Sequence, residues 1–159
     1  MPRHNTNLPE IYVQPGESHL VRKPTILRTL LGSCVGITFS VPRLGLAAIS
    51  HAMLPSYLPK RGRVNGHRYV DFAIRDLAHE FDLLGVSRSE VQVKLFGGCD
   101  VLLVGESSRP TVGKLNCESA LKTLREEGFE VAASRLGGTS GFKIQFNTGT
   151  GEVLLQQLG

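Results

Sequence analysis

The sequence Thr29-Leu30-Leu31-Gly32-Ser33-Cys34-Val35-Gly36-Ile37 places a cysteine between a small Gly-Ser pair and an apolar run. A second apolar run ends at His51, seventeen residues after Cys34, and continues as Ala52-Met53-Leu54-Pro55. A thiol and an imidazole, each at the end of a predicted strand, are the minimal parts of a cysteine nucleophile and its base. Ordinary packing of both side chains explains the same pattern, because free cysteine is among the most buried residue types. The residues alone leave both interpretations open.

The two apolar runs, Val35–Val41 and Leu46–Met53, predict a β-hairpin, because the four residues between them include proline and glycine. If only the first two of these residues form the turn, Cys34 lies directly opposite His51, with Cβ atoms about 4.5–5.5 Å apart. If all four form the loop, Cys34 faces Met53, and His51 is a diagonal neighbour within roughly 7–8 Å. A register shifted by one residue places the pair on opposite faces. Two of the three registers therefore allow the thiol and the imidazole to meet.

Outside the hairpin, apolar periodicity predicts two helices and several strands. The helix Val70–Leu84 has apolar residues at three- and four-residue steps and ends at Gly85. A second helix is predicted over Leu115–Glu127. Its predicted buried side carries Cys117, Ala120, Leu121 and Leu124. The predicted strands are Ile11–Val13, Pro24–Leu31, Val91–Phe96, Phe129–Ser134, Phe142–Asn147 and Glu152–Gln157. Strands in mixed order with two helices predict an α/β or α+β domain.

The length and composition are those of one soluble globular domain, with 159 residues, 41% hydrophobic and 20% charged. We expect residues 1–9 to form a mobile tail and residues 10–159 to form the domain. The apolar runs are shorter than the ~20 residues of a membrane helix, and no signal peptide is apparent, so we expect a cytoplasmic protein without membrane insertion. The three cysteines, Cys34, Cys99 and Cys117, are too widely spaced for a disulfide framework or a metal site. We interpret Cys99 and Cys117 as packing residues.

The formal net charge of +4 is partly concentrated in one stretch. Its basic residues are Lys60, Arg61, Arg63, His67 and Arg68. A solvated loop explains this stretch best, and attraction to an acidic protein surface is the alternative. Nucleic-acid binding is not expected, because no binding motif is present and only Tyr69 interleaves an aromatic ring. Within the same region, Pro55–Gly66 is either a rim over the cysteine and histidine or a plain connector. Gly97-Gly98 is likewise either a pocket floor or a turn.

Several runs of this sequence resemble, in order, those of the CheD family of chemoreceptor glutamine deamidases. They are Thr29–Val35, His51–Pro55, Arg68–Ala73, Leu95–Gly98, Val112–Asn116 and Leu136–Gly138. The resemblance extends from about residue 10 to the end of the chain. It implies mixed β-sheets packed as a sandwich with flanking helices, similar to the catalytic domain of cytotoxic necrotizing factor toxins.

The resemblance also implies a chemistry. Cys34 would attack the side-chain amide of a glutamine as a thiolate, forming a thioester and releasing ammonia. His51 would lower the pKa of the thiol, protonate the ammonia and then activate water. Thr29 matches the third residue of the family, whose hydroxyl would orient the imidazole. The spacing between this threonine and the cysteine varies in the family, so Thr29 is the less secure match. No metal or cofactor is implied.

An oxyanion needs hydrogen-bond donors, and here our expectation rests on the residues and not on the family. The backbone N–H groups of Cys34 and Ser33 are candidates, in a turn that includes Gly32.

The implied partners are the cytoplasmic region of methyl-accepting chemoreceptors, as substrate, and a CheC-type phosphatase of phosphorylated CheY. The alternative function is a non-catalytic module that docks on receptors or on that phosphatase. A Cys34→Ala variant distinguishes the two, because docking survives the substitution and glutamate formation does not.

Overall fold

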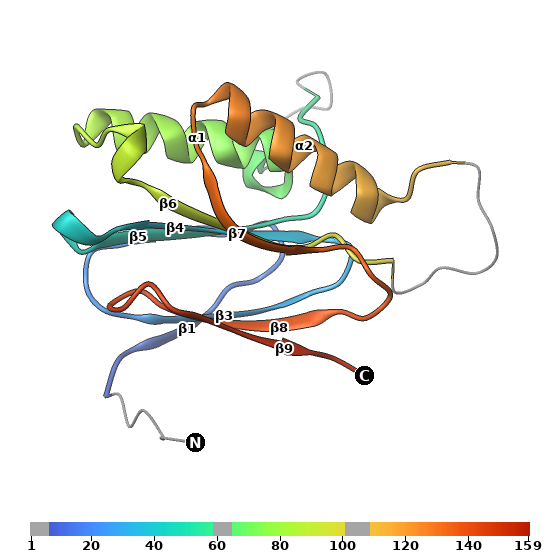
Figure 1. Cartoon of the computed structure of the whole chain (residues 1–159), viewed down its shortest axis with the longest axis horizontal. Coiled ribbons are helices and arrows are strands. Elements are labelled where there is room, and N and C mark those ends of the chain that lie inside the picture. The colour runs from blue at the N-terminus through green and yellow to red at the C-terminus, as the bar shows by residue number, and fades with distance from the viewer. Residues whose placement is uncertain (1–6, 59–64, 101–108) are drawn as a thin grey trace.

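Two β-sheets and a layer of two helices are stacked in the order helices, five-stranded sheet, four-stranded sheet (Figure 1). The computed structural model describes residues 7–58, 65–100 and 109–159. Residues 1–6 of the expected tail, which was predicted over residues 1–9, lie outside the described residues. So do the basic residues Lys60, Arg61 and Arg63. Neither helix in the described residues is long and apolar enough to cross a membrane.

The five-stranded sheet, called the helix-covered sheet below, has the strand order β2-β5-β4-β6-β7. These strands are β2 (Ser18–Val21), β5 (Leu46–Ala52), β4 (Val35–Val41), β6 (Gln92–Gly97) and β7 (Val131–Leu136). The four-stranded sheet, called the open sheet, has the order β1-β3-β8-β9. Its strands are β1 (Glu10–Tyr12), β3 (Ile26–Leu31), β8 (Phe142–Asn147) and β9 (Val153–Gln157). Each sheet mixes parallel and antiparallel pairs, which confirms the predicted α+β class.

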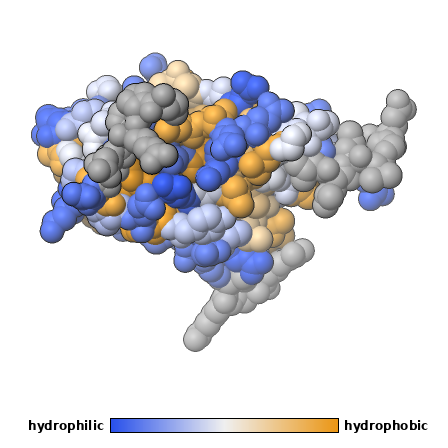
Figure 2. Space-filling model, turned by 90° about the horizontal axis from the view of Figure 1, so that it is seen from below, coloured by the Kyte–Doolittle hydropathy of each residue, from blue (hydrophilic) through white to orange (hydrophobic). Residues whose placement is uncertain are grey.

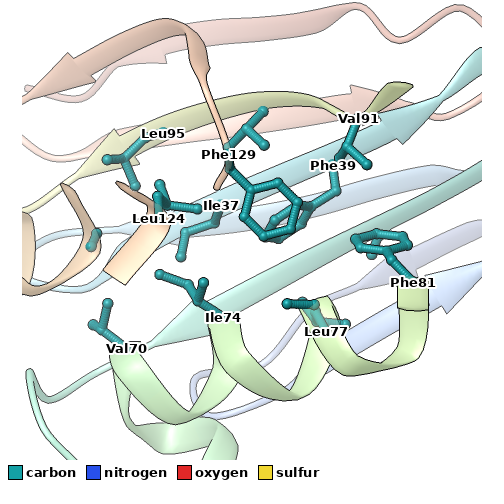
Figure 3. Close-up of a cluster of buried hydrophobic side chains, with 14 of the residues drawn as sticks. Ile37, Phe39, Val70, Ile74, Leu77, Phe81, Val91, Leu95, Leu124 and Phe129 are labelled. Atoms are coloured by element: carbon teal, nitrogen blue, oxygen red, sulfur yellow. The ribbon is translucent and has the colours of Figure 1, made fainter. Parts of the chain in front are cut away.

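The two helices, α1 (Val70–Leu83) and α2 (Val112–Glu126), lie side by side over the outer face of the helix-covered sheet (Figure 1). Below them, β4 is paired on both sides, by β5 and β6, and all of its residues are buried. Phe39 of β4 packs against Phe81 and Phe129. The centroid of the Phe39 ring lies 5.6 Å from the centroid of each of the other two rings. Figure 3 shows these rings among the aliphatic side chains that α1 and α2 contribute. This helix-side core is separate from an inter-sheet core between the two sheets.

The outer face of the open sheet carries no helix in the described part of the chain (Figure 1). Figure 2, which views the molecule from this side, shows apolar side chains dispersed among polar ones. Exposed apolar residues on its strands are Tyr12, Leu30 and Leu154. Two of the three strand pairs of this sheet are antiparallel, and antiparallel sheets commonly have one solvated face, so this arrangement requires no further layer.

The predicted hairpin is confirmed, and its register is the one with four residues in the loop. Val41 pairs with Leu46, and Val35 with Ala52. Residues Pro42–Leu44 form a short 3-10 turn, and Gly45 closes it at a φ of 60°. That left-handed conformation favours glycine. The register makes Met53 the residue opposite Cys34.

The second helix differs from its prediction at its start and on its buried face. It begins at Val112, three residues early, where the Thr111 side chain accepts a hydrogen bond from the Lys114 backbone N–H at 3.1 Å. The prediction that Leu121 is buried is wrong, because 41% of it is exposed. The buried residues of this helix are Gly113, Asn116, Ala120, Thr123 and Leu124. Gly113 packs so closely on the Gly98 and Cys99 backbone that an added Cβ would lie 2.7 Å from it. This contact sets the rotation of the helix.

Strand β2 was not expected, because it is a short edge strand whose residues are all half-buried. The other predicted elements are confirmed, with small shifts at their ends. In particular, α1 ends at Leu83, close to the predicted end, and Gly85 follows it at a φ of 71°.

Candidate active site

Cys34 lies in the turn Gly32–Cys34, which connects β3 of the open sheet to β4 of the helix-covered sheet. Two backbone hydrogen bonds fasten this turn to the end of β6. The Gly98 N–H donates to the Cys34 carbonyl, and the Cys99 N–H donates to the Gly32 carbonyl, each at 2.8 Å. Gly97 has a φ of 103°, and an added Cβ there would lie 2.3 Å from the Cys34 carbonyl oxygen. Gly97 and Gly98 both have a positive φ, and Gly97 approaches the backbone of the Cys34 turn closely.

His51 lies near the end of β5 and points into the space between the sheets, on the same face as Ala47 and Ile49 of the inter-sheet core. It is 2% exposed. Its Nδ1 atom lies 2.6 Å from the Thr29 Oγ1 atom, which comes from β3 of the opposite sheet. The structure thus brings together two of the three predicted catalytic residues across the sandwich.

The hydrogen bonds of Thr29 determine the tautomer of His51. Thr29 Oγ1 also donates to the Val13 carbonyl at 2.8 Å. A hydroxyl has one proton, so the oxygen is left to accept a hydrogen bond from Nδ1–H of the imidazole. The neutral ring therefore carries its proton on Nδ1 and an unprotonated lone pair on Nε2. A base of this form is ready to take a proton at Nε2.

Cys34 shares the face of His51. The pairing of Gly36 with His51 places Cys34 opposite Met53 and diagonal to His51, a separation of about 7–8 Å or less. Cys34 is half-buried and packs against the inter-sheet core. Cys34 and His51 therefore lie on the same side of the helix-covered sheet, next to the inter-sheet core.

Burial controls the protonation of both groups. It lowers the pKa of His51 to about 4, against a smaller opposing effect of the nearby Val13 backbone. It also raises the pKa of the Cys34 thiol above its ordinary value, and the Cys34 backbone N–H offsets this only in part. The implied lowering of the thiol pKa by His51 is therefore wrong for the free protein, because a neutral imidazole carries no charge to stabilise a thiolate. At neutral pH the pair consists of a thiol and a neutral imidazole.

The oxyanion candidates belong to a turn whose carbonyl groups are already occupied. The Ser33 carbonyl accepts from the Asn116 side chain at 2.9 Å, and the Gly32 carbonyl accepts from Cys99. Gly32 also lines an open groove of about 490 Å³ between the end of β3 and Thr139–Gly141. This groove begins two residues from Cys34.

Asn116 is the residue of the site that sequence reasoning missed. It is completely buried, and its side chain contacts the Cys34 turn. The signal was present in the Val112–Asn116 run and in the four-residue step from Asn116 to Ala120, which places a polar side chain on a buried face. Cys99 is 1% exposed, and Cys117 is partly buried against the helix-side core. Both cysteines pack as expected.

Comparison with known proteins identifies the family. The family model described as CheD chemotactic sensory transduction matches residues 53–157. A protein of Geobacter sulfurreducens named "Probable chemoreceptor glutamine deamidase CheD 2" is 44% identical over 158 residues, 99% of this chain and 96% of its own. A protein of Maridesulfovibrio salexigens named "Probable chemoreceptor glutamine deamidase CheD" is 34% identical over 99% of this chain and 97% of its own. A protein of Thermococcus kodakarensis with the same name is 33% identical over 94% of this chain and 93% of its own. The family model begins at Met53, after the three predicted catalytic residues, whereas these relatives align over nearly the whole chain. On this combined similarity, the chain belongs to the CheD family.

Proposed function

We propose that this protein hydrolyses the side-chain amide of specific glutamines in methyl-accepting chemoreceptors, giving glutamate and ammonia. The names of relatives up to 44% identical over nearly the full length support this activity. The observation that carries the mechanism is the 2.6 Å contact between Thr29 and His51, which leaves Nε2 of a buried neutral imidazole as a base on the face shared with Cys34. A docking module without catalysis has no use for this arrangement and is not favoured.

In the proposed first half-reaction, the Cys34 sulfur attacks the carbonyl carbon of the glutamine side chain while Nε2 of His51 takes the thiol proton. The carbonyl oxygen becomes an oxyanion, for which the backbone N–H groups of Ser33 and Cys34, in the turn with Gly32, are our candidate donors. The imidazolium then gives its proton to the amine, the C–N bond breaks, and ammonia leaves a thioester on Cys34.

In the second half-reaction, Nε2 takes a proton from water, and the hydroxide formed attacks the thioester. The C–S bond breaks, the Cys34 sulfur regains a proton from the imidazolium, and glutamate is released. Thr29 accepts a hydrogen bond from Nδ1–H throughout, which orients the ring and stabilises its transient charge. No step requires a metal or cofactor.

The protonation of the free site suggests why its thiol does not react indiscriminately. With the pKa of His51 near 4 and that of Cys34 raised, the thiolate is scarce until the substrate amide is in place. Proton transfer then accompanies attack, so reactivity depends on the bound substrate. In a stable thiolate–imidazolium pair, by contrast, the thiolate would be present before substrate binds.

We further propose that residues 10–159 act as a single cytoplasmic domain whose fold is similar to the catalytic domain of cytotoxic necrotizing factor toxins. A CheC-type phosphatase is the proposed regulatory partner. The fold likeness and the phosphatase partner rest on the family resemblance, and the single domain rests on the length and composition of the chain.

Mass spectrometry of a purified chemoreceptor cytoplasmic fragment tests the activity. Each deamidation adds about one mass unit, because an NH₂ group is exchanged for OH through the thioester. We expect a shift at defined glutamines with the wild-type protein and none with Cys34→Ala. Absence of any shift with a cognate receptor, while binding is retained, would contradict the proposal and favour the docking module.

A matched pair of variants at Thr29 tests the role of the hydroxyl. Thr29→Val keeps the shape of the side chain but leaves Nδ1–H of His51 without its acceptor, and we expect a loss of kcat on the order of 10²-fold. Thr29→Ser keeps the hydroxyl and should retain most of the activity. Equal activity of the two variants would remove Thr29 from the mechanism.

A further inference from the structure

We propose that Asn116 is a positioning residue that holds the Cys34 turn against the end of the strand that carries His51. This inference rests on the proposed catalytic roles of Cys34 and His51. Asn116 lies in the second turn of α2 and is 0% exposed. Its Nδ2 group donates to the Ser33 carbonyl at 2.9 Å and to the Met53 carbonyl at 3.0 Å.

The two carbonyl groups belong to the two segments that have to be aligned for catalysis. Ser33 immediately precedes Cys34, and Met53 follows His51 by two residues. The strand register makes Met53 the residue opposite Cys34. One amide group therefore joins the nucleophile turn to the end of β5, at the point where the β4–β5 ladder has ended.

The chemistry of the site requires an amide NH₂ group here. Two hydrogens satisfy two acceptors, whereas the opposite orientation of the amide would place its oxygen against two carbonyl oxygens. As a consequence, the Asn116 Oδ1 atom is buried and has no hydrogen-bond partner among the described residues. An unpaired buried acceptor costs about 1–3 kcal/mol. Buried polar atoms are ordinarily hydrogen-bonded, and exceptions such as this one are characteristic of functional sites.

The docking of α2 explains how Asn116 reaches both carbonyls. Gly113, one turn earlier, packs directly on the backbone of Gly98 and Cys99, which also fasten the Cys34 turn. Ser119, one turn later, donates from Oγ to the Pro55 carbonyl at 2.6 Å. Residues three apart on α2 therefore contact successive parts of the site region, and the middle contact is the one that touches the segments of both catalytic residues.

Ser119 provides a matched control. Ser119 lies on the same helix as Asn116 and also donates to a backbone carbonyl. That carbonyl belongs to Pro55, two residues after Met53. Ser119 makes no hydrogen bond to the Cys34 turn among those of the described residues. Ser119→Ala should therefore weaken the docking of α2 without moving Cys34 relative to His51.

The experiment compares deamidation kinetics of the wild type with Asn116→Ala, Asn116→Leu and Ser119→Ala in the full chain, each assayed below its unfolding transition. Asn116→Leu retains the packing volume, so it keeps the test informative if Asn116→Ala does not fold. We expect both Asn116 variants to lose kcat by on the order of 10²-fold, because small misplacements of reacting groups have effects of this size. Their KM should change by less than about twofold, since Asn116 is buried away from substrate. Ser119→Ala should keep both constants within about twofold.

A second readout is the alkylation rate of Cys34 by iodoacetamide between pH 6 and 9, followed on the Cys34 peptide. We expect Cys34 to react faster at each pH in the Asn116 variants, because release of the Cys34 turn exposes the thiol to water and lessens the burial that raises its pKa. Ser119→Ala should follow the wild type. Equal losses of kcat in the Asn116 and Ser119 variants, or a wild-type alkylation profile in the Asn116 variants, would overturn the inference. If the wild type does not deamidate a receptor fragment, the proposed function fails, and the alkylation profiles alone decide on Asn116.

Discussion

His51 is a nearly fully buried imidazole whose Nδ1 hydrogen bond goes to the Thr29 hydroxyl. Burial holds its pKa at about 4, against an ordinary value of 6.5. The imidazole therefore stays neutral at any pH well above 4 and remains available as a base. The same lowering of the pKa makes the stability of the fold depend on pH. The proposed catalytic role of His51 and the effect of its burial on stability are therefore measurable on one residue.

The free energy of unfolding should depend on the protonation of His51. Because its pKa is lower in the folded than in the unfolded protein, the unfolded state binds more protons between pH 6.5 and 4. The stabilisation is fully present above pH 6.5 and is lost as the pH falls towards 4, amounting to about 3 kcal/mol in total and about 2 kcal/mol by pH 5. Urea unfolding at pH 7.5 and 5.0 measures this loss.

His51→Gln is the control, since it removes the titrating group while other ionisable groups remain. The loss of stability between pH 7.5 and 5.0 should be about 2 kcal/mol smaller in this variant than in the wild type. Identical pH dependence in the two proteins would show that His51 is not buried as a neutral ring.

At the scale of elements, the end of β6 and the start of α2 together form the support of the cysteine turn. Gly97 approaches the Cys34 carbonyl, and Gly113 approaches the backbone of Gly98 and Cys99. Glycine is required at Gly97 for two reasons, a left-handed φ of 103° and the absence of space for a Cβ. These contacts join three segments far apart in the sequence without any side chain.

Gly97→Ala and Gly85→Ala form a matched pair that separates the two reasons. Gly85 also has a left-handed φ, of 71°, but nothing lies within 4 Å of an added Cβ. We expect Gly85→Ala to cost about 1–2 kcal/mol from the backbone conformation alone. Gly97→Ala should cost at least about 2 kcal/mol more and change the alkylation rate of Cys34, because the turn has to move. Equal unfolding free energies by urea titration would show that the close approach is absent.

At the scale of the whole molecule, the helix-covered sheet separates two hydrophobic cores, and only one of them contacts Cys34 in the part of the chain that the structure describes. The helix-side core holds the aromatic rings of Phe39, Phe81 and Phe129 (Figure 3). The inter-sheet core lies against Cys34. The helix-side core holds the larger share of the buried apolar residues, and the proposed chemistry lies on the other face of the sheet.

This separation predicts that stability and activity respond independently to a helix-side substitution. Phe39→Ala removes a completely buried ring and should lower the free energy of unfolding by about 3–5 kcal/mol. Deamidation by the fraction that remains folded at low temperature should stay within about twofold of the wild type. Leu83→Ala, at a residue 69% exposed, should change stability by less than about 0.5 kcal/mol. A large loss of activity in folded Phe39→Ala protein would show that the two cores are coupled.

The sequence by itself determined the elements whose signals are local. The β4–β5 hairpin and helix α1 follow from turn residues and apolar periodicity, which act over a few residues. Cys34 and His51 emerged as candidates because each ends a predicted strand, and the family resemblance added Thr29.

Only the tertiary structure decided which of the possible hairpin registers is adopted, that Thr29 meets His51 across two sheets, and that Asn116 is buried where Leu121 is exposed. It also decided the direction of the Cys34 pKa, which burial raises. The physical reason is common to all of these. Register, cross-sheet contacts, helix rotation and desolvation depend on how distant segments pack, and apolar patterns in the sequence report only the neighbourhood of each residue along the chain.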